Sequence, residues 1–257
     1  MGMDTGTHSS SGRMDLRGRV FVVTGGSRGI GLAIAAALVE GGGRVVITGR
    51  DQDQLEAAAG DLQRSAADRD AVHAVRADVR NAREAAGTID TAVRRFGGLD
   101  VLVNNAGVGL FAEVAGMAVA EWDQVIETNL SGVFYCCHAA LPHLRSRGGG
   151  WIINISSLAG KSSFAGGAAY CASKAGLNAF SESLMQEVRH DNIRVSCIMP
   201  GSVSTGFSGR GSSGEADWKI APADIAEIVV DLITFPVRSL PSRIELRPSR
   251  PPSGTKK

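Results

Sequence analysis

The sequence is poor in aromatic residues and in cysteine, and it carries almost no net charge. Phe, Trp and Tyr together make up 5% of the 257 residues, and 27 Lys and Arg stand against 26 Asp and Glu. A chain so balanced gives no electrostatic argument for nucleic acid or an anionic membrane surface, and we expect neither as a partner. No apolar run approaches the length of a membrane span, and the N-terminus lacks the apolar core of a signal peptide. The sequence therefore predicts a cytoplasmic protein.

The four cysteines exclude a further kind of site. Cys136 and Cys137 are adjacent in an apolar stretch, while Cys171 and Cys197 stand apart. This spacing matches no metal-ligand pattern, so we predict no metal site. Buried free thiols are the better interpretation, and they are consistent with a reducing compartment.

What the sequence does contain is a regular alternation of strand and helix patterns. Short β-branched runs alternate with helical stretches, which is typical of a parallel sheet with helices on both faces. The expected strands are 20–24, 44–48, 71–76, 101–104, 151–156, 194–199 and 242–246. The expected helices are 29–40, 51–64, 82–95, 118–146, 168–190 and 222–232. We predict an α/β fold, a Rossmann-type doubly wound parallel sheet of about seven strands.

The same pattern sets the expected domain limits. No linker divides the chain, so residues 15–248 are predicted to form a single Rossmann-type domain with the substrate pocket built into it. Residues 1–14, rich in Gly, Ser and Thr, are expected to be a disordered leader, and residues 249–257 a flexible basic tail.

A glycine-rich segment, TGGSRGIG at residues 24–31, directly follows the first expected strand and precedes a helix. Glycines let a backbone approach a pyrophosphate closely, and a helix N-terminus offers free N–H groups and the positive end of its dipole. The spacing of Gly25, Gly29 and Gly31 differs from the usual G-x-G-x-x-G fingerprint. Taken alone, these glycines fit either a phosphate-binding turn or a plain tight turn.

Tyr170 and Lys174 are the most informative pair of residues. Residues four apart share one face of a helix, so the Lys174 ammonium can lie beneath the Tyr170 phenol. A nearby cation favours the phenolate and lowers the pKa of the phenol, which suits it for acid–base chemistry. The spacing alone is weak evidence, because many helices carry such a pair by chance.

Six motifs, in order and spacing, resemble the single-domain short-chain dehydrogenases/reductases. They are TGxxxGxG at 24–31, NNAG at 104–107, Asn129, Ser157, Tyr170-x-x-x-Lys174 and Pro200-Gly201. The resemblance runs from about Leu16 to about Pro248. It implies an enzyme that interconverts a carbonyl and a secondary alcohol by hydride transfer with a nicotinamide cofactor.

The resemblance also implies a role for each of four catalytic residues. Tyr170 is expected to be the general acid/base, and Lys174 to lower its pKa and bind the nicotinamide ribose. Ser157 is expected to hydrogen-bond the substrate oxygen; its neighbour Ser156 is the rival, and spacing to Tyr170 favours Ser157. Asn129 is expected to hold a water that links Lys174 to solvent.

The preferred cofactor is expected to be NADP(H), with NAD(H) possible. Gly49 stands where an acidic ribose-binding residue usually falls, and Arg50 follows it, which suits a 2′-phosphate. Arg28 can add a second positive charge, whereas Asp51 could turn toward a ribose or cap the next helix. Asp78 resembles the family aspartate that bonds the adenine. The full expected cofactor-binding set is Gly25, Ser27, Arg28, Gly29, Ile30, Gly31, Arg50, Asp78, Val79, Asn105, Ala106, Gly107, Tyr170, Lys174, Pro200, Gly201, Val203 and Thr205.

The substrate is left open by the sequence. The walls of its pocket are expected at 108–111, 158–164 and in a lid-like loop at 206–220. A 3-oxoacyl thioester, a steroid-like ketone and a small sugar ketone all fit an apolar lining. A non-catalytic NADP-binding sensor and a nucleotide-sugar epimerase or dehydratase are alternatives on related folds. By analogy, the two long helices predict a homodimer or homotetramer, although the C-terminal segment departs from the family pattern.

Overall fold

The computed structural model describes residues 16–205, 207 and 218–252 of the chain. The expected leader at 1–14 lies outside these residues. So do residues 253–257 of the expected tail and most of the loop at 206–220.

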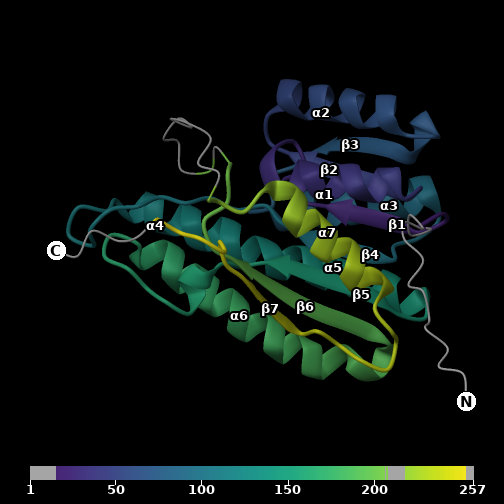
Figure 1. The fold of residues 1–257 in the computed structure, drawn as a ribbon. Coiled ribbons are helices and arrows are strands. Elements are labelled where there is room, and N and C mark those ends of the chain that lie inside the picture. Colours follow the sequence, from purple (N-terminus) through teal and green to yellow (C-terminus); the bar gives the residue numbers. More distant parts are fainter. Residues whose placement is uncertain (1–15, 206, 208–217, 253–257) are drawn as a thin grey trace, which may run out of the picture.

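Seven parallel strands form one sheet in the order β3-β2-β1-β4-β5-β6-β7 (Figure 1). The strands are β1 (Val20–Val23), β2 (Arg44–Gly49), β3 (Val72–Arg76), β4 (Val101–Asn104), β5 (Gly150–Ile155), β6 (Ile193–Pro200) and β7 (Arg243–Leu246). Each agrees with an expected strand to within one residue at either end. The strand order reverses between β1 and β4, so a crevice is expected there at the carboxyl ends of the strands. The predicted doubly wound fold is confirmed.

In the part of the chain that the structure describes, seven α-helices connect the strands. They are α1 (Gly29–Glu40), α2 (Gln52–Ser65), α3 (Ala82–Phe96), α4 (Val119–Ile126), α5 (Gly132–Ser146), α6 (Ala168–Val188) and α7 (Pro222–Thr234). The sequence predicted one helix over 118–146, but the structure divides it with a π-helical turn at Glu127–Ser131. A π turn adds one residue to the helical repeat, which hydropathy alone does not reveal. None of the helices in the described part of the chain combines the length and apolar character that crossing a membrane requires.

The helices cover both faces of the sheet because successive strand residues point in opposite directions. In β1, Phe21 and Val23 enter a core shared with α1, α2 and α7. Val20 and Val22 enter a second core shared with α3, α5 and α6. All four side chains are fully buried, so β1 is apolar throughout rather than alternating.

A chain of buried polar side chains crosses the second core below the carboxyl ends of the strands. Asn104 donates to Asn154 Oδ1 at 2.8 Å, and Asn154 donates to Ser181 Oγ at 2.8 Å. These bonds join β4, β5 and α6. In the described residues, the Oδ1 atom of Asn104 is the buried side-chain atom without a hydrogen-bond partner. The chain fixes the relative position of the elements that carry the predicted catalytic residues.

Candidate active site

A cleft of about 800 Å³ lies at the carboxyl ends of the strands, where the strand order reverses. Its volume is within the usual range for a small-molecule site. The cleft is lined by nearly every residue that the sequence predicted for the site. The two that do not line it are Gly31 and Asn129, which lie behind the lining and act on it indirectly.

The glycine turn after β1 is shaped for close backbone approach. Gly25 and Gly29 have φ angles of +64° and +56°, a region that favours glycine. A Cβ atom on Gly31 would lie 2.2 Å from the carbonyl oxygen of Gly25, so Gly31 permits the start of α1 to pack on the turn. Arg28, at the N-cap of α1, makes no side-chain capping bond. The N–H groups at this helix end are therefore available to an anion such as a pyrophosphate.

The loop after β4 fastens the glycine turn to the rest of the cleft. Asn105 Nδ2 donates to the carbonyl oxygens of Thr24 and Gly25, both at 3.0 Å. A Cβ on Gly25 would lie 2.9 Å from Ala106 Cα, so the two loops are in contact. From the other side, Thr205 would meet a Cβ on Gly29 at 3.4 Å. Loops after β1, β4 and β6 thus form one rigid cradle.

The end of the cleft formed by the loops after β2 and β3, here called the β2–β3 end, carries Arg50, and Arg28 lies in the glycine turn after β1. Arg28 and Arg50 both line the cleft with exposed side chains. Of the two roles left open for Asp51, the structure shows the capping role, because its carboxylate accepts from Gln54 N at 3.0 Å. A Cβ on Gly49 would meet Ser27 Oγ at 3.2 Å, so this position is tight for any side chain.

Asp78 is held by a residue that sequence reasoning missed. Arg80 Nε lies 3.1 Å and 2.9 Å from the two carboxylate oxygens, and Arg80 Nη2 lies 2.6 Å from Oδ2. This bond to Arg80 lowers the pKa of Asp78. The carboxylate expected to bond an adenine is therefore already paired. The position of an arginine two residues after the aspartate could have indicated this ion pair from the sequence.

Tyr170, Ser157 and Lys174 line the same cleft. Burial raises the pKa of Tyr170 above its usual value, and a hydrogen bond with Ser157 partly offsets that rise. Ser156 points elsewhere and donates to Asn178 Oδ1 at 2.6 Å, which leaves Ser157 as the serine beside the tyrosine.

Lys174 is buried near the ring of Tyr170. Its side chain is buried, and its amine donates to the carbonyl oxygen of Ile155 at 2.9 Å. The amine lies 5.9 Å from the centroid of the Tyr170 ring. Burial lowers the pKa of Lys174 to about 8. Burial is the main cause that raises the pKa of Tyr170, and the lowering of that pKa by Lys174 stays a prediction.

Asn129 lies in the π-helical turn and is fully buried behind the cleft. Its Oδ1 accepts from Val108 N at 2.8 Å, and its Nδ2 donates to Val108 O at 2.9 Å. The same Nδ2 donates to Ser173 Oγ at 3.0 Å. The side chain therefore joins the loop after β4 to the helix that bears Tyr170 and Lys174. The predicted water relay stays a prediction.

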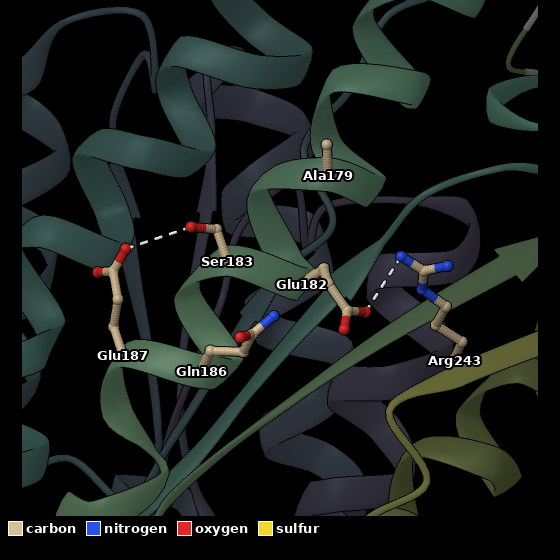
Figure 2. A pocket seen from close by; sticks show the side chains of 6 residues that line it. All are labelled: Ala179, Glu182, Ser183, Gln186, Glu187 and Arg243. Atoms are coloured by element: carbon tan, nitrogen blue, oxygen red, sulfur yellow. Dashed lines mark hydrogen bonds and ion pairs between the residues drawn. The ribbon is translucent and has the colours of Figure 1, made fainter.

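A second hollow on the surface carries none of the predicted residues (Figure 2). It is lined by one face of α6 and by Arg243 of β7. Its charges are paired, since Arg243 lies 3.0 Å from Glu182 and Ser183 donates to Glu187 at 3.3 Å. The side chains of this hollow give no indication of a catalytic site. Within the described residues, no three His, Cys, Asp or Glu side chains gather closely enough to hold a metal ion.

Comparison with known proteins gives matches over most of the chain. A family model described as short chain dehydrogenase matches residues 19–216. An uncharacterized oxidoreductase of Staphylococcus aureus (strain USA300) is 35% identical over 233 residues, which cover 91% of this chain and 98% of that protein.

Two solved structures have a fold similar to that of this chain. A metagenomic short-chain oxidoreductase in complex with NADP is 39% identical with a TM-score of 0.80, and the match covers 92% of this chain and 99% of that one. An alcohol dehydrogenase from the archaeon Thermococcus sibiricus, complexed with 5-hydroxy-NADP, is 30% identical with a TM-score of 0.84, covering 91% and 98%. Each match covers more than nine tenths of this chain.

Proposed function

The chain belongs to the short chain dehydrogenase family and is an oxidoreductase, and on this premise we propose that it interconverts a carbonyl and a secondary alcohol with NADP(H). The observation that carries the proposal is the meeting of Ser157, Tyr170 and Lys174 in one cleft with the glycine turn. The cradle fits a dinucleotide, since Gly31 leaves no room for a Cβ and the N-terminus of α1 has no side-chain cap.

The bound nicotinamide supplies the hydride chemistry, and the protein supplies the proton and the orientation. In reduction, Tyr170 gives its hydroxyl proton to the carbonyl oxygen. Burial raises the pKa of this hydroxyl, so the hydroxyl is protonated at neutral pH. Ser157 donates a hydrogen bond to the same oxygen and stabilises its developing negative charge. Below about pH 8, the amine of Lys174 carries a positive charge near the Tyr170 ring.

We propose NADP(H) as the preferred cofactor because of charge at the β2–β3 end of the cleft. Arg50 presents an exposed guanidinium group there, and Arg28 presents a second one from the glycine turn after β1. Planar guanidinium groups bind phosphate with paired hydrogen bonds. Asp51, the nearest acidic rival, caps α2. The two solved relatives named above were crystallised with NADP or 5-hydroxy-NADP, which supports the same choice.

The decisive experiment is a screen of ketones and secondary alcohols with NADPH, NADP, NADH and NAD in parallel. It should include 3-oxoacyl thioesters, because a 3-oxoacyl-reductase-like activity belongs to the proposed class. In Tyr170→Phe we expect kcat to fall by about 100-fold or more while NADP binding is kept. Tyr135→Phe is the matched control, because Tyr135 lies in α5 outside the cleft.

Two results would argue against the proposal. Full activity of Tyr170→Phe would remove the tyrosine from the mechanism. Tight NADP binding without turnover of any carbonyl or alcohol would instead favour the non-catalytic sensor.

We also propose that the protein is a homodimer or homotetramer. Phe134 on α5 is 48% exposed, and its ring packs against Phe180 of α6 with centroids 6.4 Å apart. Such an aromatic surface on two long helices fits a self-association face. Light scattering during gel filtration tests this, and a monomeric mass at micromolar concentration would contradict it.

A further inference from the structure

Three phenylalanines of the cleft form a cluster with Tyr170, two of them next to its ring and the third next to Phe111. The centroid of the Phe111 ring lies 5.5 Å from that of Tyr170, in an edge-to-face arrangement. Phe164 lies 5.9 Å from Phe111, and Phe207 lies 5.9 Å from Tyr170. All three line the cleft. In a chain with 5% aromatic residues, this clustering beside the predicted proton donor is a marked concentration.

These rings pack closely against the backbone of two glycines. A Cβ on Gly109 would lie 2.6 Å from Phe207 and 2.9 Å from Phe111, so both rings pack on the bare backbone of that glycine. A Cβ on Gly167 would likewise lie 2.6 Å from Phe164. Yet the three phenylalanines keep 41–49% of their surface exposed. Because they line the cleft, part of that exposed apolar surface is available to a ligand.

The three phenylalanines form a wall of the cleft that carries no charge of its own. Among the described lining residues the carboxylates are Asp51 and Asp78, which are engaged at the β2–β3 end by Gln54 N and Arg80. Lys174 donates to the backbone of Ile155. Lys219 is exposed, and its amine lies 5.9 Å from the centroid of the Trp218 ring. The rings therefore offer apolar and π contacts, with no carboxylate beside them in the described lining.

We propose that the substrate is an aryl ketone, or the matching secondary aryl alcohol, whose carbonyl carbon bears an aromatic ring. This inference rests on the proposed function and names its substrate class. With the carbonyl oxygen at Tyr170 and Ser157, the ring attached to the carbonyl carbon meets the Phe111–Phe164 wall. Aromatic rings prefer edge-to-face or offset contacts with one another, which a saturated ring of the same size makes less well. In the reaction the carbonyl carbon gains the hydride, the oxygen gains the Tyr170 proton, and NADPH is oxidised to NADP.

The experiment compares phenyl methyl ketone with cyclohexyl methyl ketone, which differ in whether the ring on the carbonyl carbon is aromatic. We expect kcat/KM with NADPH to be about fivefold or more higher for the phenyl compound. Phe111→Leu and Phe164→Leu keep an apolar side chain and remove the ring, and each should lower this ratio by about threefold. Phe235→Leu is the control, since Phe235 is 40% exposed and does not line the cleft. It should leave the ratio unchanged.

A binding measurement separates this inference from the proposed function. Calorimetry of the Tyr170→Phe protein, loaded with NADP, compares phenyl methyl and cyclohexyl methyl carbinol without any turnover. Tighter binding of the phenyl carbinol, lost in the Phe111→Leu background, supports the aryl inference even if no ketone is reduced. Equal rates and equal binding for the two rings overturn it, even if both ketones are reduced.

Discussion

Asn129 and Val108 form a reciprocal pair, in which the side-chain amide of Asn129 bonds both the N–H and the C=O of Val108. A third bond reaches Ser173, whose hydroxyl in turn donates to the carbonyl of Tyr170 at 2.8 Å. The loop after β4 and the helix of the predicted proton donor are thereby connected through one buried amide.

We therefore predict that Asn129→Ala lowers the free energy of unfolding by about 3 kcal/mol, because the partly buried backbone of Val108 and the buried hydroxyl of Ser173 each lose a hydrogen-bond partner. Denaturant unfolding measures this. Gln186→Ala, on the exposed face of α6, should change stability by less than about 0.5 kcal/mol. A similar loss in both variants would show that the amide pair has no special role.

Gly31→Ala should destabilise the protein and weaken NADP binding. The new Cβ would lie 2.2 Å from the Gly25 carbonyl oxygen, so the glycine turn must shift. We expect about 2 kcal/mol of lost stability or more, and at least about a tenfold rise in the Kd for NADP.

Gly87→Ala is the opposite case and the control for that variant. Gly87 lies inside α3, and a Cβ there meets nothing within 4 Å. Alanine is the better helix former, so stability should rise by about 0.5–1 kcal/mol with NADP binding unchanged. Thermal unfolding and titration with NADP measure both effects.

Arg50→Asp should shift cofactor preference from NADPH toward NADH. The substitution replaces a guanidinium at the β2–β3 end of the cleft with a carboxylate that repels a 2′-phosphate. We expect the ratio of kcat/KM values for NADPH and NADH to fall by about 10- to 100-fold. Arg238→Asp makes the same charge change outside the cleft and should leave the ratio as it is. An unchanged ratio in Arg50→Asp would contradict the assignment of Arg50.

Lys174 should make stability depend on pH in the alkaline range. Its pKa is lowered to about 8 in the folded protein, whereas an unfolded chain holds that proton up to about pH 10.4. Between these values the unfolded state binds more protons, so the lysine contributes stability that increases as the pH rises. Relative to Lys174→Met, the free energy of unfolding of the wild type should gain up to about 1.4 kcal/mol per pH unit above pH 8. A difference that stays flat from pH 8 to about 10 would contradict the lowered pKa.

The sequence predicted the sheet well because its signals are local. Apolar runs such as Val20–Val23, followed by glycines and a helical pattern, identify a strand and its turn without any tertiary information. The same local logic placed the glycine turn, Ser157 and Tyr170 on loops and helix ends that meet in one cleft.

What the sequence could not predict depends on distant contacts. The π turn around Asn129 and its bond to Val108, 21 residues away, follow from packing rather than from propensity. The bidentate Arg80 was missed because it depends on rotamers in a loop. The balance of burial and charge at Tyr170 requires knowing how deeply the phenol and the Lys174 amine are enclosed.

Strand β1 sends alternate side chains into the two cores and runs directly into the glycine turn. One extra residue inserted in β1 would turn its whole side-chain set over and displace the turn by about 3.3 Å. Such an insertion would disrupt both the packing of the two cores and the position of the glycine turn. Insertions and deletions in β1 are therefore opposed for two reasons at once. Loops at the amino ends of the strands are not linked to the cradle in this way, and evolution is freer to lengthen them.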